Sequence, residues 1–318
     1  MYDFEFITEI NQDIQDIFTI SDYKCDMKKI AVLLTCYNRI EKTVNCLRSL
    51  FEAIDLSGYE IKFDIYLVDD GSTDGTYEEI NRQFPAVIII KGSGNLFWAR
   101  GMRLAWETAL SADFEYDAFL LLNNDVILSE NFIGTLIETH EFCLRNMNQS
   151  GIYVCSTIDP GSSDISYGGK LISKKGIKVK SFRVNPSEVP VPCSVANANI
   201  LMVTNAVVKT IGILDPRYVH QIADYDYTLT ASEKGIPVMV CPGIGGFCVN
   251  DHGNSWLSSG SSLKDRILYL YSPTGLAYRE QLYYLKKNFR YQFPYYFILL
   301  WLKTIFPFVW DKFKKDSD

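Results

Sequence analysis

The chain has 318 residues, of which 47% are hydrophobic and 22% charged, and its formal net charge is -7. This composition is typical of an ordered globular protein, and it argues against a general nucleic-acid binder, which would concentrate Lys and Arg to neutralise phosphates. The eight cysteines form no CxxC pair, and several lie in apolar runs. They predict buried thiols in a reducing compartment and imply neither a disulfide scaffold nor a zinc knuckle.

The first 27 residues predict an amphipathic helical extension. Phe6, Ile10, Ile14 and Ile17 recur at a spacing of three to four residues among acidic side chains. The segment has neither the basic start nor the apolar run of a secretory signal. We therefore expect a cytoplasmic protein.

Residues 28–130 alternate short apolar runs with helical stretches. The apolar runs are KKIAVLLTCYN, FDIYLVDD, AVIIIKG and DAFLLLNND, and helices are expected over residues 41–53, about 77–83 and within GNLFWARGMRLAWETAL. This alternation predicts an α/β fold with a Rossmann-like, mostly parallel central sheet flanked by helices. Ligands are expected at the carboxyl ends of the strands.

Residues 131–260 are less regular and are expected to form the second half of the site. GSSDISYGG and NPSEVPVP predict loops, VANANILMVT predicts a strand, and a helix that Gly235 closes is expected to start around Asp224 and Asp226. Together with residues 28–130 they make one expected domain over residues 28–260.

Residues 261–318 are rich in Tyr, Phe, Leu and Lys and predict a helical, aromatic and basic tail. Its apolar run, residues 293–310, contains two prolines and Lys303, so it falls short of the roughly 20 apolar residues that a spanning helix needs. Aromatic rings interleaved with Lys and Arg are typical of helices that lie in a membrane interface. The alternative is a tail packed on the rest of the chain or on a second subunit.

Two aspartates follow the second apolar run, in VDDGSTDGT. Asp69 and Asp70 stand at the carboxyl end of an expected strand beside a loop rich in Gly and hydroxyl groups. Such carboxylates can accept hydrogen bonds from a nucleotide base or a ribose. Ordinary turn and capping chemistry explains the same residues equally well.

The fourth run ends in LLLNNDVIL. Asn123 and Asp125 are two residues apart in an extended segment, so they can face one ligand. A carboxylate beside a carbonyl oxygen suits Mg2+ or Mn2+, which also bind phosphate oxygens. A loop-forming Asn-Asn-Asp is the alternative. His252, in a later polar loop, is either a further ligand or a solvated imidazole.

Asp224 and Asp226 lie at the expected helix start in QIADYDYTLTASEKG. A carboxylate in the first turn of a helix is stabilised as the anion, which suits a base that must be unprotonated at neutral pH. Simple capping of the helix is the alternative.

Six motifs follow one another in this order: IAVLLTCYNR, LVDDGSTDGT, LLLNNDV, the SYGG loop, ILDPRYVHQIADYDYTLTASEKG and DHGNS. Taken together, they resemble those of the family 2 glycosyltransferases, which are inverting enzymes of the GT-A fold. The resemblance extends over about residues 29–256. GNLFWARGM and residues 266–288 further resemble the rhamnosyl and related transferases that build bacterial surface polysaccharides.

The resemblance implies a role for each group of residues. Asp224 would be the catalytic base, with Asp226 a possible second carboxylate, and Asp125 and His252 would bind the metal. Arg100 and Arg103 stand where the family more usually has small or amide residues, and they would either pair with a diphosphate or be surface charges on a helix. The nucleotide sugar would contact Thr35, Tyr37, Asn38, Arg39, Asp69, Asp70, Asn95, Trp98, Arg100, Asn123 and Asn124. The acceptor would contact Tyr167, Gly168, Gly169, Asn197, Asn199 and Trp256.

The implied activity is inverting, metal-dependent transfer of a sugar to a hydroxyl of a glycan acceptor, in O-antigen or capsule synthesis. The donor would be a nucleotide diphosphate sugar, with UDP or dTDP expected, and the acceptor would be linked to polyprenyl diphosphate. Mg2+ or Mn2+ would be the cofactor, the membrane surface and a second copy of the chain possible partners, and the inner face of the cell membrane the location.

Two other functions stay open at this point. Asn123 replaces the first Asp of the DxD metal motif, which would fit a donor-binding partner of another transferase that has lost its own activity. A nucleotidyltransferase would need a Gly-rich phosphate loop bearing Lys or Arg near its N-terminus, and TCYNRIEK does not have this pattern.

Overall fold

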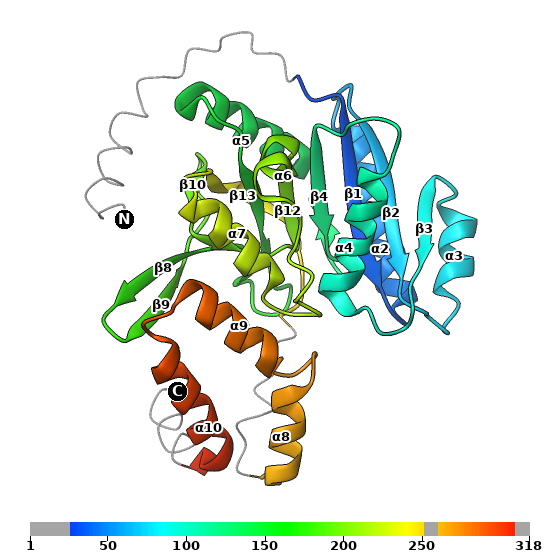
Figure 1. Ribbon diagram of the computed structural model, residues 1–318. Helices are drawn as coiled ribbons and strands as arrows, with labels where there is room; N and C mark the ends of the chain where they lie inside the picture. Colours follow the sequence, from blue (N-terminus) through cyan, green and yellow to red (C-terminus); the bar gives the residue numbers. More distant parts are fainter. Residues whose placement is uncertain (1–25, 251–259, 309–318) are drawn as a thin grey trace.

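The computed structural model describes residues 26–250 and 260–308, which form a central mixed sheet covered by helices (Figure 1). The sheet has the order β10-β13-β6-β12-β4-β1-β2-β3, with β5 paired to β13 and β7 to β6. Its strands are β1 (Lys29–Cys36), β2 (Lys62–Asp69), β3 (Val87–Lys91), β4 (Ala118–Leu122), β5 (Ile127–Leu128), β6 (Ile152–Ile158), β7 (Ile165–Tyr167), β10 (Val191–Pro192), β12 (Ile200–Thr204) and β13 (Val238–Phe247).

The expected α/β fold with a mostly parallel sheet is confirmed. β3, β2, β1 and β4 are parallel neighbours, and β6 and β13 form a second parallel pair. β12 lies between these two groups and is antiparallel to both β4 and β6. Because of this reversal, the start of β12 lies at the same edge of the sheet as the carboxyl ends of β1, β2 and β4.

The sheet has one apolar core on each face because its strands are apolar at nearly every position. In β1, Ala31 and Leu33 enter one core, whereas Val32 and Leu34 enter the other. The first core also contains residues of α4 (Phe97–Leu110), α6 (Asn205–Ile211) and α7 (Ala223–Glu233). The second contains residues of α2 (Ile40–Leu56), α3 (Thr76–Gln83) and α5 (Phe132–Met147).

The middle of the chain is more ordered than its loop-like composition predicts. A second sheet of three strands, β11-β8-β9, is formed by β8 (Gly169–Lys175), β9 (Lys178–Arg183) and β11 (Val195–Ala196). Part of GSSDISYGG is therefore strand, because β7 pairs with β6 and β8 pairs with β9. These pairings are long-range or hairpin contacts that override the local preference of Gly and Ser for turns.

Three helices follow the sheet: α8 (Leu263–Tyr271), α9 (Tyr278–Asn288) and α10 (Phe293–Ile305). Arg266 of α8 donates to the carbonyl of Thr304 in α10 at 2.8 Å, and Trp301 of α10 donates to the Tyr278 hydroxyl of α9 at 2.8 Å. Within residues 26–250 and 260–308, none of the helices has the length and apolar character needed to cross a bilayer. The expected helix in residues 1–27 lies almost entirely outside the described residues.

The seven described cysteines are buried, as expected from their apolar surroundings, and form no disulfide with one another. Desolvation raises the pKa of Cys36 and of Cys193 to about 12. These thiols are therefore protonated at neutral pH and contribute to packing as small apolar groups.

Candidate functional site

The candidate site lies at the edge where β1, β2 and β4 end and β12 begins. Parallel strands direct their carboxyl ends to one edge, and in a doubly wound sheet that edge binds ligands. The antiparallel β12 adds its own first residues to this edge. The amide of Asn123, just after β4, donates to the carbonyl of Asn199, just before β12, at 3.0 Å.

After β2, Asp70 organises the loop that leads to α4. One carboxylate oxygen accepts from the amide of Gly94 at 2.8 Å, and the other accepts from the amides of Leu96 and Phe97 at 2.8 and 3.0 Å. Gly92 passes so close that a Cβ there would lie 2.6 Å from Asp70 Oδ1. The resemblance implies a contact between Asp70 and the base, but in the structure these oxygens bind the loop backbone.

Trp98 follows this loop, in the first turn of α4, and its side chain contacts a residue at the end of β4. Its indole Nε1 donates to Asn123 Oδ1 at 2.7 Å, and its backbone amide donates to His220 Nδ1 at 3.3 Å. The structure thus joins Trp98 and Asn123, which the sequence separates by 25 residues. The bond also fixes Asn123 with its amide oxygen as the acceptor.

Asp125 is neutralised by two cations from the start of α2. Arg39 Nη1 lies 2.9 Å and Lys42 Nζ lies 3.9 Å from the same carboxylate oxygen, and the Asp125 side chain is 15% exposed. Cys248 Sγ lies 3.8 Å from the other oxygen. The sequence reasoning named Arg39 and missed Lys42, although the spacing of three residues on one helix face would have suggested it.

A divalent metal fits this edge only if water and substrate phosphate oxygens supply most of its ligands. Among the described residues, no group of three or more His, Cys, Asp or Glu side chains is arranged to hold a metal ion. Asp125 offers one carboxylate and Asn123 one amide oxygen. That set suits Mg2+ or Mn2+ that keeps water and takes substrate phosphate oxygens, but it does not suit a metal held by protein alone. His252 lies outside the described residues.

Asp224 lies in the first turn of α7, directed at the segment before β12. Its carboxylate accepts from the amide of Ala198 at 3.1 Å and from that of Tyr225 at 2.8 Å. Desolvation by the surrounding residues raises the pKa of Asp224, while these hydrogen bonds and the nearby charge of Lys170 oppose the shift. The result is a carboxylate that binds a proton more tightly than an exposed aspartate does.

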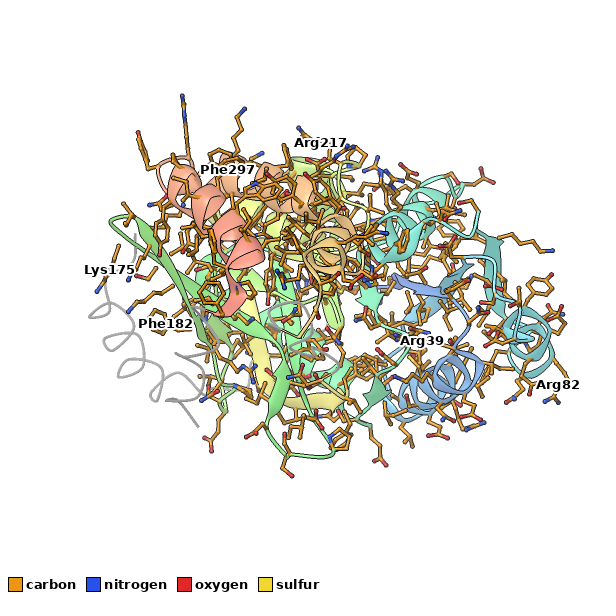
Figure 2. The ribbon with its side chains drawn as sticks, turned by 90° about the horizontal axis from the view of Figure 1, so that it is seen from below. Arg39, Arg82, Lys175, Phe182, Arg217 and Phe297 are labelled. Carbon is orange, nitrogen blue, oxygen red and sulfur yellow. The ribbon has the colours of Figure 1, made fainter. Side chains whose placement is uncertain are left out.

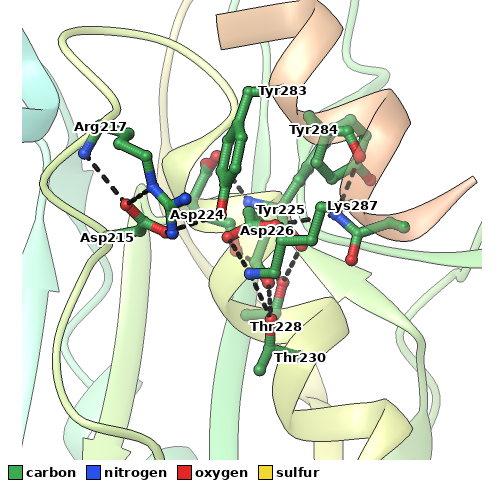
Figure 3. A network of polar contacts seen from close by, with 11 residues as sticks. Asp215, Arg217, Asp224, Tyr225, Asp226, Thr228, Thr230, Tyr283, Tyr284 and Lys287 are labelled. Carbon is green, nitrogen blue, oxygen red and sulfur yellow. Dashed lines mark hydrogen bonds and ion pairs between the residues drawn. The ribbon is translucent and has the colours of Figure 1, made fainter.

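Asp226 has different surroundings, although it is only two residues further on (Figure 3). Its side chain is buried, and it pairs with Lys287 Nζ at 2.7 Å and accepts from Asn288 Nδ2 at 2.8 Å. Both partners belong to α9. Asp226 therefore connects α7 to α9, whereas Asp224 is directed at the segment of residues 197–199.

Residues 197–199 connect the two halves of the site. The amide of Ala198 binds Asp224, and the carbonyl of Asn199 binds the amide of Asn123. Asn197 accepts from the Tyr225 hydroxyl at 3.3 Å, and its amide donates to the carbonyl of Gly168 at 3.1 Å. The expected acceptor residues Tyr167, Gly168, Gly169, Asn197 and Asn199 are therefore brought together around this segment, while Trp256 lies outside the described residues.

Several expected donor residues have other surroundings. Asn124 is buried against α2, where it donates to Thr43 Oγ1 at 2.8 Å, and Thr35 packs against Gly101 of α4. Arg103 binds the carbonyl of Leu214 and pairs with Glu107, so it is not available to a diphosphate as expected. Asp69 is the buried last residue of β2 and accepts from the amide of Ser72 at 2.9 Å. The remaining members of the donor set are exposed: Tyr37, Asn38, Asn95 and Arg100.

Two residues that the sequence did not indicate, Glu280 and His220, hold backbone groups next to this edge in place. Glu280 of α9 is buried and accepts from the amides of Val219 and His220 at 2.9 and 3.4 Å. Burial, and secondarily the charge of Arg39, lower the pKa of His220, which keeps its imidazole neutral as an acceptor for Trp98. No sequence pattern points to Glu280, because its partners are backbone groups 60 residues away.

Comparisons with known proteins give a family match to the first half of the chain. The family model described as glycosyl transferase family 2 matches residues 31–164. Curated protein sequences give no match. The matched segment runs from β1 to the residue before β7 and contains Asp70, Asn123 and Asp125.

Among solved structures, the chain is similar to the mannosyltransferase PcManGT from Pyrobaculum calidifontis in complex with GDP-Man and Mn2+. The two chains are 11% identical, the TM-score is 0.47, and the match covers 78% of this chain and 65% of that chain. It is also similar to S. aureus TarS 1-349, at 15% identity with a TM-score of 0.48, and to the same protein in complex with UDP, at 14% identity with a TM-score of 0.49. Each of these two covers 70% of this chain and 60% of that chain. The chain thus spans less than two thirds of these structures. Over residues 31–164, the chain is similar to glycosyl transferase family 2.

Proposed function

We propose that this chain is an inverting glycosyltransferase, which moves a sugar from a nucleotide diphosphate sugar to a hydroxyl of a glycan acceptor. The observation that carries the proposal is the bridge at residues 198 and 199. Ala198 binds the candidate base Asp224, and the next residue, Asn199, binds Asn123 at the donor edge. A base and a donor-binding motif held by adjacent residues suit a reaction between two bound substrates.

In this proposal Asp224 is the catalytic base. Its carboxylate takes the proton of the acceptor hydroxyl as that oxygen attacks the anomeric carbon of the donor sugar. The bond from that carbon to the diphosphate oxygen breaks on the opposite face, so the configuration inverts. The raised pKa of Asp224 supports the role, because a more basic carboxylate is a better proton acceptor in its ionised form.

The cations around Asp125 are proposed to meet the diphosphate. Arg39, just before α2, and Lys42, in its first turn, lie at the edge where the leaving group would lie, and both are close to the carboxylate of Asp125. Arg39 would bind phosphate oxygens and Lys42 would supply a further positive charge. Mg2+ or Mn2+, held by Asp125 with Asn123 nearby, would neutralise charge on the departing diphosphate when bound.

The donor and acceptor are narrower parts of the proposal. The resemblance of GNLFWARGM to rhamnosyl and related transferases supports a UDP- or dTDP-linked donor and a polyprenyl-diphosphate-linked acceptor in O-antigen or capsule synthesis. Such an acceptor would place the enzyme at the inner face of the cell membrane. A homo-oligomer stays compatible with this arrangement, and nucleic acid is not expected as a partner.

A second candidate function is a donor-binding protein without turnover that assists another transferase. Asn123 supports it, since the amide replaces a carboxylate at the expected metal motif and its oxygen already accepts from Trp98. Turnover separates the two functions. The alternative predicts donor binding and no transfer with any acceptor.

The experiment that tests the proposal is calorimetric titration of the purified chain with UDP-, GDP- and dTDP-sugars, each with Mg2+, with Mn2+ and with EDTA. Tight binding of one donor that weakens in EDTA is expected, and that donor then defines a transfer assay with lipid-linked and free glycan acceptors. Absence of binding to every donor would refute the proposal. Binding without transfer to any acceptor would favour the second candidate.

A further inference from the structure

Positive charge is concentrated in two segments of an otherwise acidic chain. Residues 169–183 and 260–308 contain 13 of the 31 Lys and Arg residues and only two acidic residues, although the chain as a whole has a net charge of -7. The first segment is the hairpin of β8 and β9, and the second contains α8, α9 and α10. The charge is therefore asymmetric in the fold as well as in the sequence.

The same two segments expose apolar side chains. They hold 12 of the 21 large hydrophobic residues that are exposed in the described part of the chain. In α10, Ile298, Leu302 and Ile305 follow at spacings of four and three, so they form one stripe along the helix. The hairpin adds Ile177 and Phe182, which are 59% and 53% exposed.

The hairpin and the helices form one continuous surface. Tyr296 of α10 uses its hydroxyl to accept from the amide of Val179 at 2.9 Å and to donate to the carbonyl of Val179 at 3.1 Å. Gln292 donates to the carbonyl of Gly176 at 2.9 Å. Figure 1 shows the hairpin beside α9 and α10 on the lower side of the molecule, and Figure 2 looks at that side, with Lys175, Phe182 and Phe297 labelled.

We propose that this surface, made of the β8–β9 hairpin with α8 and α10 and here called the docking face, binds the surface of an anionic membrane. Charge complementarity identifies the partner. Lysines that surround exposed aliphatic and aromatic side chains match a layer of anionic headgroups above acyl chains. A second copy of the same face fits less well, because two basic surfaces would repel each other.

Helix α9 packs against α8 and α10 of the docking face and also contacts the candidate site. Glu280 of α9 binds the segment of Val219 and His220, and His220 in turn binds Trp98 at the donor edge. Helix α9 would therefore connect a membrane bound to the docking face with the candidate site. This reason for docking, access to a lipid-linked acceptor, rests on the proposed function, whereas the charge and exposure of the face do not.

The test is flotation of the full chain with two kinds of vesicle, one of phosphatidylcholine alone and one that also contains phosphatidylglycerol. We expect binding to the anionic vesicles only, with a marked loss as salt is raised. The hairpin variant Lys175→Glu/Lys178→Glu/Lys180→Glu should lower the bound-to-free ratio by at least about tenfold. The variant Lys28→Glu/Arg48→Glu/Lys209→Glu makes the same change in net charge at exposed positions elsewhere and should bind as the unmodified chain does.

Exposed apolar side chains are tested separately with Ile298→Ser/Leu302→Ser, which should also weaken binding to anionic vesicles. Circular dichroism checks that all variants are folded. No binding to anionic vesicles, equal binding to both kinds, or an unaffected hairpin variant would overturn the proposal. So would a dimer in sedimentation that the Ile298→Ser/Leu302→Ser variant dissociates. Vesicle binding needs no sugar donor. A chain that binds anionic vesicles but no donor would therefore refute the proposed function and still support membrane binding by the docking face.

Discussion

Asp224 and Asp226 lie in the same turn of α7, on two sides of the helix with different electrostatic surroundings. Toward α9, Asp226 is buried with a lysine and an asparagine amide as partners. Toward residues 197–199, Asp224 receives two backbone amides, and desolvation raises its pKa. Asp226 thus links α7 to α9. Asp224, whose pKa is raised, has the chemistry of a proton acceptor.

The largest expected effect comes from removing the carboxylate on the site-facing side. Asp224→Asn should lower the rate of sugar transfer by about 10³-fold, since a positioned general base contributes 10² to 10⁴. Donor affinity in calorimetry should stay within about twofold, because donor binding is assigned to the other half of the site. Asp215→Asn, a change in a carboxylate that pairs with Arg217, should retain transfer. Wild-type rates for Asp224→Asn would remove Asp224 from the mechanism.

The other side of the comparison is tested by stability. Lys287→Met leaves Asp226 buried without its cation, and we expect the free energy of unfolding to fall by about 2–3 kcal/mol, at the low end for a broken buried pair because Lys287 is partly exposed. Lys286→Met, at the neighbouring exposed position, should change it by less than about 0.5 kcal/mol. Urea unfolding curves of both variants give the difference. Equal stability of the two would show that the Asp226 pair is not structural.

A third prediction uses the pH dependence of stability to test the burial of the Asp224 carboxylate. Because its folded-state pKa is raised, Asp224 stabilises the fold fully only below its ordinary pKa of 3.8, and this stabilisation is lost as pH rises through the raised value. Asp224→Asn cannot ionise, so its melting temperature relative to the unmodified chain should increase between pH 4 and pH 7. Transfer by the unmodified chain should fall as pH decreases through the same raised pKa. A constant difference in melting temperature would contradict the burial of this charge.

The fold followed from sequence periodicity, and the departures have identifiable causes. Runs such as IAVLLTC are apolar at nearly every position, which predicts a sheet covered on both faces, and β1 has this environment. The antiparallel insertion of β12 was not predictable from the sequence, since VANANILMVT indicates a strand but not its direction. Strands β7 to β9 depend on pairings that the local sequence of Gly, Ser and Lys does not encode.

The candidate site was predictable to the level of motifs, but not of partners. Alternation along an extended segment places Asn123 and Asn124 on opposite sides, and Asn124 accordingly faces Thr43 of α2. The partners of Asp70, Trp98 and Glu280 are backbone groups or distant side chains, which no spacing rule identifies. The role of each site residue in donor or acceptor binding stays a prediction.

The smallest expected effect concerns the donor edge, where the geometry of Asn123 depends on one indole hydrogen bond. Trp98→Phe keeps most of the ring and removes the donor to Asn123 Oδ1, a loss of about 1 kcal/mol that should weaken donor binding by about fivefold. Trp301→Phe removes a bond of similar length, to the Tyr278 hydroxyl, away from the site, and should leave donor affinity unchanged. Calorimetric titration of both variants with the same donor separates loss of this contact from loss of a tryptophan in general. If both variants lost affinity equally, the effect would come from the stability of the fold, and Asn123 would need no orientation by Trp98.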